Sequence, residues 1–152
     1  MKIPLAIDGS LHSGAAIAAV AHQTWPRDTV VQILTVIHPA VPPLPDPILT
    51  IASVPEEQVH ELRRLAPQLL EKASQQIRPN RDVIVTTKIL EGSPKHVIVE
   101  EAREWGADLI VVGARGYGRL TGLALGSVAG AVAADAPCSV QIIRTKQGSP
   151  GE

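Results

Sequence analysis

The residue types best suited to chemistry form two groups that lie far apart in the chain. Asp8 directly follows the apolar run of residues 3–7, and its carboxylate can accept hydrogen bonds from a ribose hydroxyl or an adenine amino group. The second group is a set of spaced glycines: Gly113, two residues, Gly116, nine residues, and then Gly126 followed by Ser127. Glycine lets a backbone approach a phosphate closely and adopts a positive φ without strain. Together the two groups predict a site for a phosphorylated nucleoside.

Neighbouring residues would complete such a site. A helix that starts at Ser127 would present the amides of Gly126, Ser127 and Val128 to an anion. Val36, at the end of a second apolar run, would pack against a base. Arg115 and Arg119 are phosphate partners in one interpretation and merely solvated surface charge in the other. The sequence leaves these two interpretations open.

Other chemical signatures are missing from the sequence. It contains neither G-x-x-x-x-G-K-[ST] nor G-x-G-x-x-G, which argues against a P-loop and a dinucleotide fingerprint. No G-x-S-x-G surrounds Ser127, so we interpret it as a helix cap rather than a nucleophile. The five histidines are scattered and Cys138 is alone, so we expect no protein metal site and no catalytic residues. Cys138 is interpreted as a small hydrophobe.

Alternating apolar runs and helical patterns supply the elements that would position these residues. We predict strands over residues 3–7, 29–37, 82–90, 109–112 and 140–143. Helices are predicted over 11–25, from a capping box at Ser53 and Glu56 up to Pro79, over 94–105, and over 127–134. Pro67 should kink or split the second helix. The proline-rich segment 39–47 excludes regular structure and would serve as a lid, a partner surface or a spacer.

This alternation of strands and helices predicts one parallel sheet with helices on both faces. In such folds a ligand binds beyond the carboxyl ends of the strands, where the strand order reverses. Asp8 leaves the first predicted strand and Gly113 leaves the fourth. If these two strands are neighbours, both groups of residues face one crevice.

Composition excludes several classes of protein. The 152 residues suit a single domain, and with no Phe the core must consist of Val, Ile, Leu and Ala, as in a buried parallel sheet. A formal charge of -1 argues against a nucleic-acid partner. The apolar run of residues 3–7 is too short for a signal peptide, and no run of about 18 apolar residues suggests a membrane span. We therefore expect a soluble, cytoplasmic protein that forms no intramolecular disulfide.

Five segments resemble the universal stress protein family across nearly the whole chain. They are IPLAIDGS at residues 3–10, the GSP turn at 92–94, ADLIVVGARG at 107–116, and LGSVA at 125–129 with APC at 136–138. The ATP-binding branch of that family carries G-x2-G-x9-G-[ST], which Gly113, Gly116, Gly126 and Ser127 match position by position. Ser139 departs from the family, which usually has proline after the cysteine.

The resemblance implies a Rossmann-like, doubly wound α/β domain over residues 1–144, with five parallel strands in the order 3-2-1-4-5 and a flexible tail over 145–152. It also implies that ATP or AMP, often with Mg²⁺ on the phosphates, is bound by Asp8, backbone at Ala6 and Ile7, Val36 and the four motif residues. Family members commonly form homodimers by pairing their last strands, which here run from Val140 to Ile143.

Three functional hypotheses follow. The first is a stress-response regulatory protein in which an adenine nucleotide orders the loop between Gly113 and Gly126 and so acts as a switch for a protein partner. The second is a slow ATPase or nucleotide-dependent transferase. The lack of an evident general base or arginine finger argues against it. The third is a dimeric interaction module that works without nucleotide. In the first hypothesis ATP, AMP and a cyclic nucleotide are alternative ligands.

Overall fold

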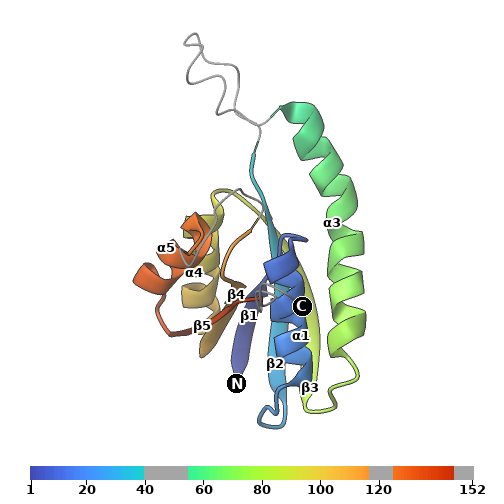
Figure 1. The fold of residues 1–152 in the computed structure, drawn as a ribbon, viewed down its shortest axis with the longest axis vertical. Helices are drawn as coiled ribbons and strands as arrows, with labels where there is room; N and C mark the ends of the chain where they lie inside the picture. Colours follow the sequence, from blue (N-terminus) through green and yellow to red (C-terminus); the bar gives the residue numbers. More distant parts are fainter. Residues whose placement is uncertain (40–54, 117–124, 146–152) are drawn as a thin grey trace, which may run out of the picture.

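The computed structural model describes residues 1–39, 55–116 and 125–145, and its centre is a five-stranded sheet (Figure 1). The strands are β1 (Lys2–Ala6), β2 (Thr29–Ile37), β3 (Val83–Glu91), β4 (Leu109–Gly113) and β5 (Ser139–Ile143). Their order is β3-β2-β1-β4-β5, and every neighbouring pair is parallel. The expected fold class and strand order are confirmed.

Two layers of helices enclose this sheet. The helices are α1 (Leu11–His22), α3 (Glu56–Ile77), α4 (Pro94–Trp105) and α5 (Ser127–Asp135). α1 and α3 lie on one face of the sheet, and α4 and α5 lie on the other (Figure 1). Within the described ranges, no helix combines the length and the apolar character that crossing a bilayer requires.

Strand alternation divides the core into two apolar layers. Odd-numbered residues of β1, such as Ile3 and Leu5, pack with α1 and α3, whereas Ile110 and Val112 of β4 pack with α4 and α5. All four side chains are at most 3% exposed, as expected for strands covered on both faces. The aliphatic composition therefore fills a core on each side of a single sheet.

The first helix ends earlier than its sequence pattern predicts. It stops at His22 with Gln23 as its C-cap, and Trp25 lies beyond it. The ring of a proline clashes with the residue before it and disfavours the helical conformation there. Pro26 has this effect on Trp25. The Trp25 ring instead enters the core, 8% exposed, and its Nε1 donates to the Val20 carbonyl at 2.9 Å.

The predicted split of the long helix at Pro67 is wrong. α3 is one helix of 22 residues with Pro67 inside it. Pro67 is exposed, so the carbonyl that loses its donor lies on the solvent side, where water can bind it. Ala66 and Leu70 are buried on either side and hold the helix against the core. The N-cap is Pro55, without a side-chain hydrogen bond.

Several expectations fall outside the described residues. These are Ser53 of the expected capping box, most of the proline-rich segment, Arg119 with its loop, and the tail beyond Thr145. Of the expected tail, Thr145 is described, and its backbone N–H donates to His12 Nδ1 at 3.4 Å.

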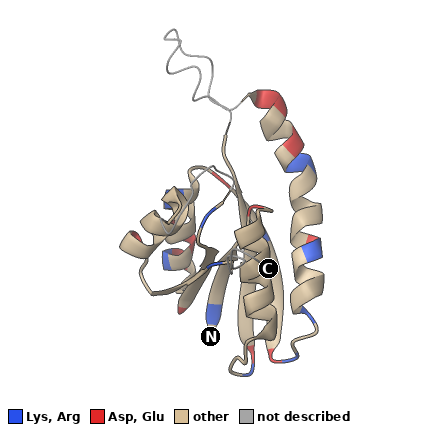
Figure 2. Cartoon of the chain, in the orientation of Figure 1, with Lys and Arg blue, Asp and Glu red and all other residues tan. Residues whose placement is uncertain are grey.

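Charged residues of both signs are interspersed over the described surface, for example along α3 (Figure 2). One ion pair differs from the exposed ones because its acid is buried. Lys88 Nζ on β3 lies 2.8 Å from both carboxylate oxygens of Glu101 on α4, whose side chain is 8% exposed. This ion pair connects the edge strand β3 to α4.

We predict that Lys88→Met lowers the free energy of unfolding by about 1–3 kcal/mol, because it leaves the Glu101 carboxylate buried without its cation. Glu101→Gln should cost less, since the 44% exposed Lys88 can turn to water. The matched control is Arg63→Met, which breaks the exposed pair with Glu91 and should change stability by less than about 0.5 kcal/mol. Urea denaturation measures all three. Equal losses for Lys88→Met and Arg63→Met would contradict the prediction.

Candidate functional site

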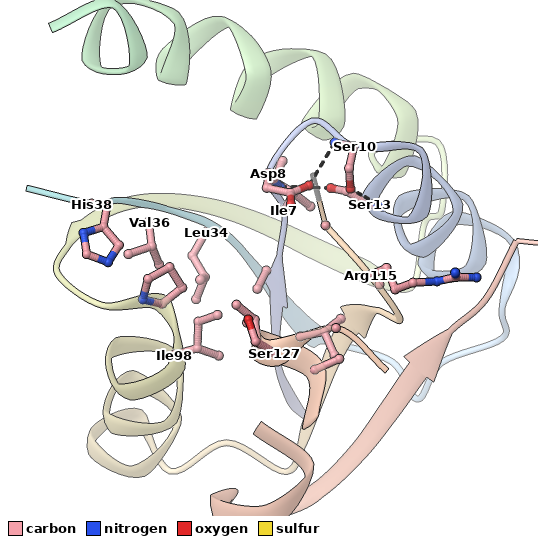
Figure 3. Close-up of a pocket in the computed structure, with 18 residues that line it drawn as sticks. Ile7, Asp8, Ser10, Ser13, Leu34, Val36, His38, Ile98, Arg115 and Ser127 are labelled. Atoms are coloured by element: carbon pink, nitrogen blue, oxygen red, sulfur yellow. Dashed lines mark hydrogen bonds between the residues drawn. The ribbon is translucent and has the colours of Figure 1, made fainter. Parts of the chain in front are cut away.

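A cavity of about 570 Å³ opens at the carboxyl ends of β1, β2 and β4 (Figure 3). Apart from Arg119, which lies outside the described residues, its walls include the residues that the sequence proposed for the site: Ala6, Ile7, Asp8, Val36, Gly113, Arg115, Gly116, Gly126, Ser127 and Val128. The structure thus brings together residues that lie up to 122 positions apart in the chain. Their role in binding stays a prediction.

The pairing of β1 with β4 creates this crevice. Ala6 of β1 lies in register with Val112 of β4, so Asp8 and Gly113 leave the sheet at the same edge. β2 and β3 continue the sheet on one side of β1, and β4 and β5 continue it on the other. The strand order therefore reverses between β1 and β4, which is where open parallel sheets bind ligands.

A network of local hydrogen bonds fixes the turn that carries Asp8. Asp8 Oδ1 accepts from the Ser10 backbone N–H at 2.8 Å, and the Asp8 backbone N–H donates to Ser13 Oγ at 3.1 Å (Figure 3). Gly9 adopts a φ of 83°, a left-handed conformation that glycine accepts without strain. Ser10 is the N-cap of α1, since its side chain accepts from Ser13 N at 3.3 Å.

The motif glycines are needed for close packing and not for a positive φ, which corrects one expectation. Among the described glycines only Gly9, Gly92 and Gly106 have a positive φ. A Cβ on Gly113 would lie 2.8 Å from the backbone carbon of His12 at the start of α1.

The other two motif glycines show the same constraint. A Cβ on Gly116 would collide with the Asp8 carboxylate, and a Cβ on Gly126 would lie 3.2 Å from Arg115 Cα. Each motif glycine therefore marks a place where another part of the cavity wall comes into contact.

The start of α5 forms one wall. Gly126 is the N-cap and Ser127 is the first residue of the helix, so the expected capping role of Ser127 is wrong. The Gly126 N–H donates to the Ala114 carbonyl at 2.8 Å, which ties the helix start to the end of β4. First-turn amides of a helix have no partner within the helix, so Ser127 and Val128 bring N–H groups and the positive end of the dipole to the cavity.

Arg115 lines the cavity, but its guanidinium extends away from Asp8 and Ser127 (Figure 3). Among the described residues, no group of three or more His, Cys, Asp or Glu side chains is placed to hold a metal ion. Burial raises the pKa of the Cys138 thiol, which favours its protonated form and agrees with a packing role.

Sequence reasoning missed eight residues of the cavity wall. They are Ser10, Ser13, Leu34, His38, Pro94, Ile98, Val112 and Ala129. One signal was available, because Leu34 and Val36 share a face of β2 and His38, directly after the strand, continues the same two-residue spacing. The approach of α4 to that face depends on tertiary packing, and no local pattern in the sequence indicates it.

The fold and this cavity define a Rossmann-like α/β protein with a ligand-sized hollow at its topological switch point. The model of the universal stress protein family matches residues 1–144, so the chain belongs to the universal stress protein family. It is similar to the universal stress protein YxiE of Bacillus subtilis, with 34% identity over 147 residues, covering 94% of this chain and 98% of the relative.

Solved structures of the family share this architecture. The universal stress protein UspA from Lactobacillus plantarum superposes with a TM-score of 0.75 at 26% identity, covering 95% of this chain and 97% of that one. A universal stress protein family member from Arabidopsis thaliana with AMP bound has a TM-score of 0.65 at 21% identity, covering 96% and 92%. The second likeness shows a common fold.

The close contact between Gly113 and His12 should be visible in the stability of the protein. Gly113→Ala should lower the free energy of unfolding by about 1–3 kcal/mol, because the new methyl group must displace the start of α1. Gly14→Ala is the matched control: it lies inside α1 with nothing within 4 Å of the added Cβ, and it should stabilise by up to about 1 kcal/mol. Guanidinium denaturation compares the two, and a Gly113→Ala variant as stable as the parent would show that this contact is not tight.

Proposed function

We propose that this protein binds an adenine nucleotide, ATP or AMP, in the cavity at the carboxyl ends of β1, β2 and β4, and that it works as a nucleotide-dependent regulatory switch in stress responses. The observation that carries the proposal is the convergence of Asp8, the three motif glycines and the start of α5 on one cavity. The AMP bound to the Arabidopsis family member supports the choice of ligand class.

The backbone of β2 supports recognition of adenine. Val30 N donates to Met1 O, and Leu34 O accepts from Ile7 N, so every second residue of β2 directs its backbone groups toward β1. The register between β1 and β2 ends at the pair Ala6 and Leu34. Val36 is the next residue of this series on β2, and it lies beyond the end of β1. A backbone N–H and C=O at this position complement adenine, which carries an amino donor beside ring-nitrogen acceptors.

The other side of the cavity supports binding of ribose and phosphate. Asp8 is a hydrogen-bond acceptor for sugar hydroxyls, and its turn is held in place by Ser10 and Ser13. The amides of Ser127 and Val128 provide an anion site at the start of α5. Mg²⁺ would enter bound to the phosphates, because the protein needs no ligand cluster of its own for that mode of binding.

The regulatory part of the proposal rests on the position of the motif. Gly116 and Gly126 flank the part of the motif that separates β4 from α5, so a nucleotide held by both glycines would contact the chain on each side of it. Ligand contacts of this kind can order a segment that a protein partner reads.

We predict that ATP or AMP at about 100 times its Kd raises the Tm of the protein by roughly 5 °C or more. Asp8→Asn should weaken binding about tenfold or more, because it removes the charged acceptor while an amide oxygen can still accept from Ser10 N. The control is Asp28→Asn, at a turn residue with a φ of 61° that asparagine also tolerates and that does not line the cavity. Differential scanning fluorimetry and calorimetry measure both effects, and an unchanged Tm in the wild type would reject the proposal.

A homodimer through β5 is the second part of the proposal, and it is supported by the position of that strand. β5 is one edge of the described sheet. Ala114 N donates to Ile143 O, so odd-numbered residues of β5 face β4, whereas Val140 and Ile142 direct their backbone groups to the open edge. An unpaired strand edge of this kind is a template for pairing with another chain.

Light scattering after gel filtration should accordingly find a dimer that Ile142→Pro converts to a monomer. Proline at this position removes an outward N–H and leaves the bonds to β4 in place. Thr87→Pro is the matched control, because Thr87 directs its N–H outward from β3, the opposite edge. That variant should remain dimeric. A monomeric wild type, or a dimer that survives Ile142→Pro, would refute pairing through β5.

A further inference from the structure

The geometry of the cavity points to His38: we propose that the His38 imidazole stacks on the base of the bound nucleotide and forms the outer part of the base pocket. This inference rests on the proposed function, since it assigns one wall of the same cavity. It adds a residue and a contact that the glycine motif does not supply.

His38 continues a row of side chains along one face of β2. Leu34 and Val36 project to the same side of β2, and His38 is the next residue of this alternating series, one residue beyond the end of the strand at Ile37. All three line the cavity. The exposure of the row increases toward the mouth: Leu34 is fully buried, Val36 is half-buried, and His38 is exposed. Figure 3 shows the three in sequence, with His38 outermost. A flat ligand lying on Leu34 and Val36 therefore meets His38 next.

The start of α4 forms the wall of the cavity that lies opposite Leu34, Val36 and His38. Pro94 is the first residue of the helix and Ile98 follows one turn later, so the two side chains share one face of α4. Both line the cavity together with the β2 row, and Ile98 is 2% exposed. The result is an apolar slot between a strand and a helix, which suits a planar aromatic ring.

Polar groups are distributed unevenly around the cavity. Asp8, Ser10, Ser13 and Arg115 lie away from the apolar slot, and Ser127 stands at the start of α5 (Figure 3). Among the described residues that line the cavity, His38 has the one polar side chain at the end where the apolar slot opens, past Val36. An imidazole can place its ring face against a base and keep both nitrogens in water at the mouth, so it extends an apolar floor without burying an unpaired polar atom.

The test compares AMP affinities by calorimetry in the full chain. Stacking of an aromatic side chain on a base predicts that His38→Ala weakens AMP binding about fivefold or more, whereas His38→Phe retains the ring and stays within about twofold of the wild type. His60→Ala is the matched control, because His60 is an exposed histidine on α3 that does not line this cavity. It should leave the affinity unchanged.

NMR of the imidazole protons provides a readout that a purely structural role would not move. With AMP, the ring current of the base should shift the His38 resonances upfield, whereas ribose 5-phosphate should not shift them and His60 should not respond to either. AMP binding that is equal in wild type and His38→Ala, or His38 resonances that do not move with AMP, would overturn this inference alone. A wild type that binds neither ATP nor AMP would overturn the proposed function as well.

Discussion

The parallel pairing of β1 with β4 is the contact on which the cavity depends. The two strands end at the same edge of the sheet, where Gly113 is the last residue of β4 and Asp8 lies two residues beyond the end of β1. Because α1 packs on one face and α5 on the other, the chain diverges at this edge and leaves a hollow between the two exits. If β1 and β4 were not neighbours, the two groups of chemically suited residues would lie at separate edges and no common site would form.

The glycine motif acts on folding as well as on the surface it offers to a ligand. Gly113 admits the backbone of His12, Gly116 admits the carboxylate of Asp8, and Gly126 admits the backbone of Arg115. A side chain at Gly113 or Gly126 would press on the backbone of His12 or Arg115, and one at Gly116 would displace the Asp8 carboxylate. The spacing of the motif therefore reflects the distances between β4, α1 and α5, and the same lack of side chains leaves backbone accessible at the cavity surface.

Sequence patterns predicted the elements well where local physics dominates. The aliphatic strands and the helix that Gly106 ends follow from burial on both faces and from a left-handed C-cap with a φ of 69°. Two errors concern prolines. Before Pro26 a local rule ends α1 at His22, earlier than the helical pattern indicates. Pro67, by contrast, is tolerated because burial on the opposite side of α3 outweighs one lost hydrogen bond.

By itself, the sequence determined the class of fold, the residues of the glycine motif and the position of Asp8 at a strand exit, because periodicity and spacing are properties of the chain. Only the tertiary structure decided that α4 brings Pro94 and Ile98 to the same cavity as Leu34 and His38, and that the motif glycines serve close approach rather than unusual backbone angles. The physical reason is that a cavity is the space left between elements that pack together. Its walls depend on how helices settle on the sheet, and that depends on contacts between residues distant in the chain.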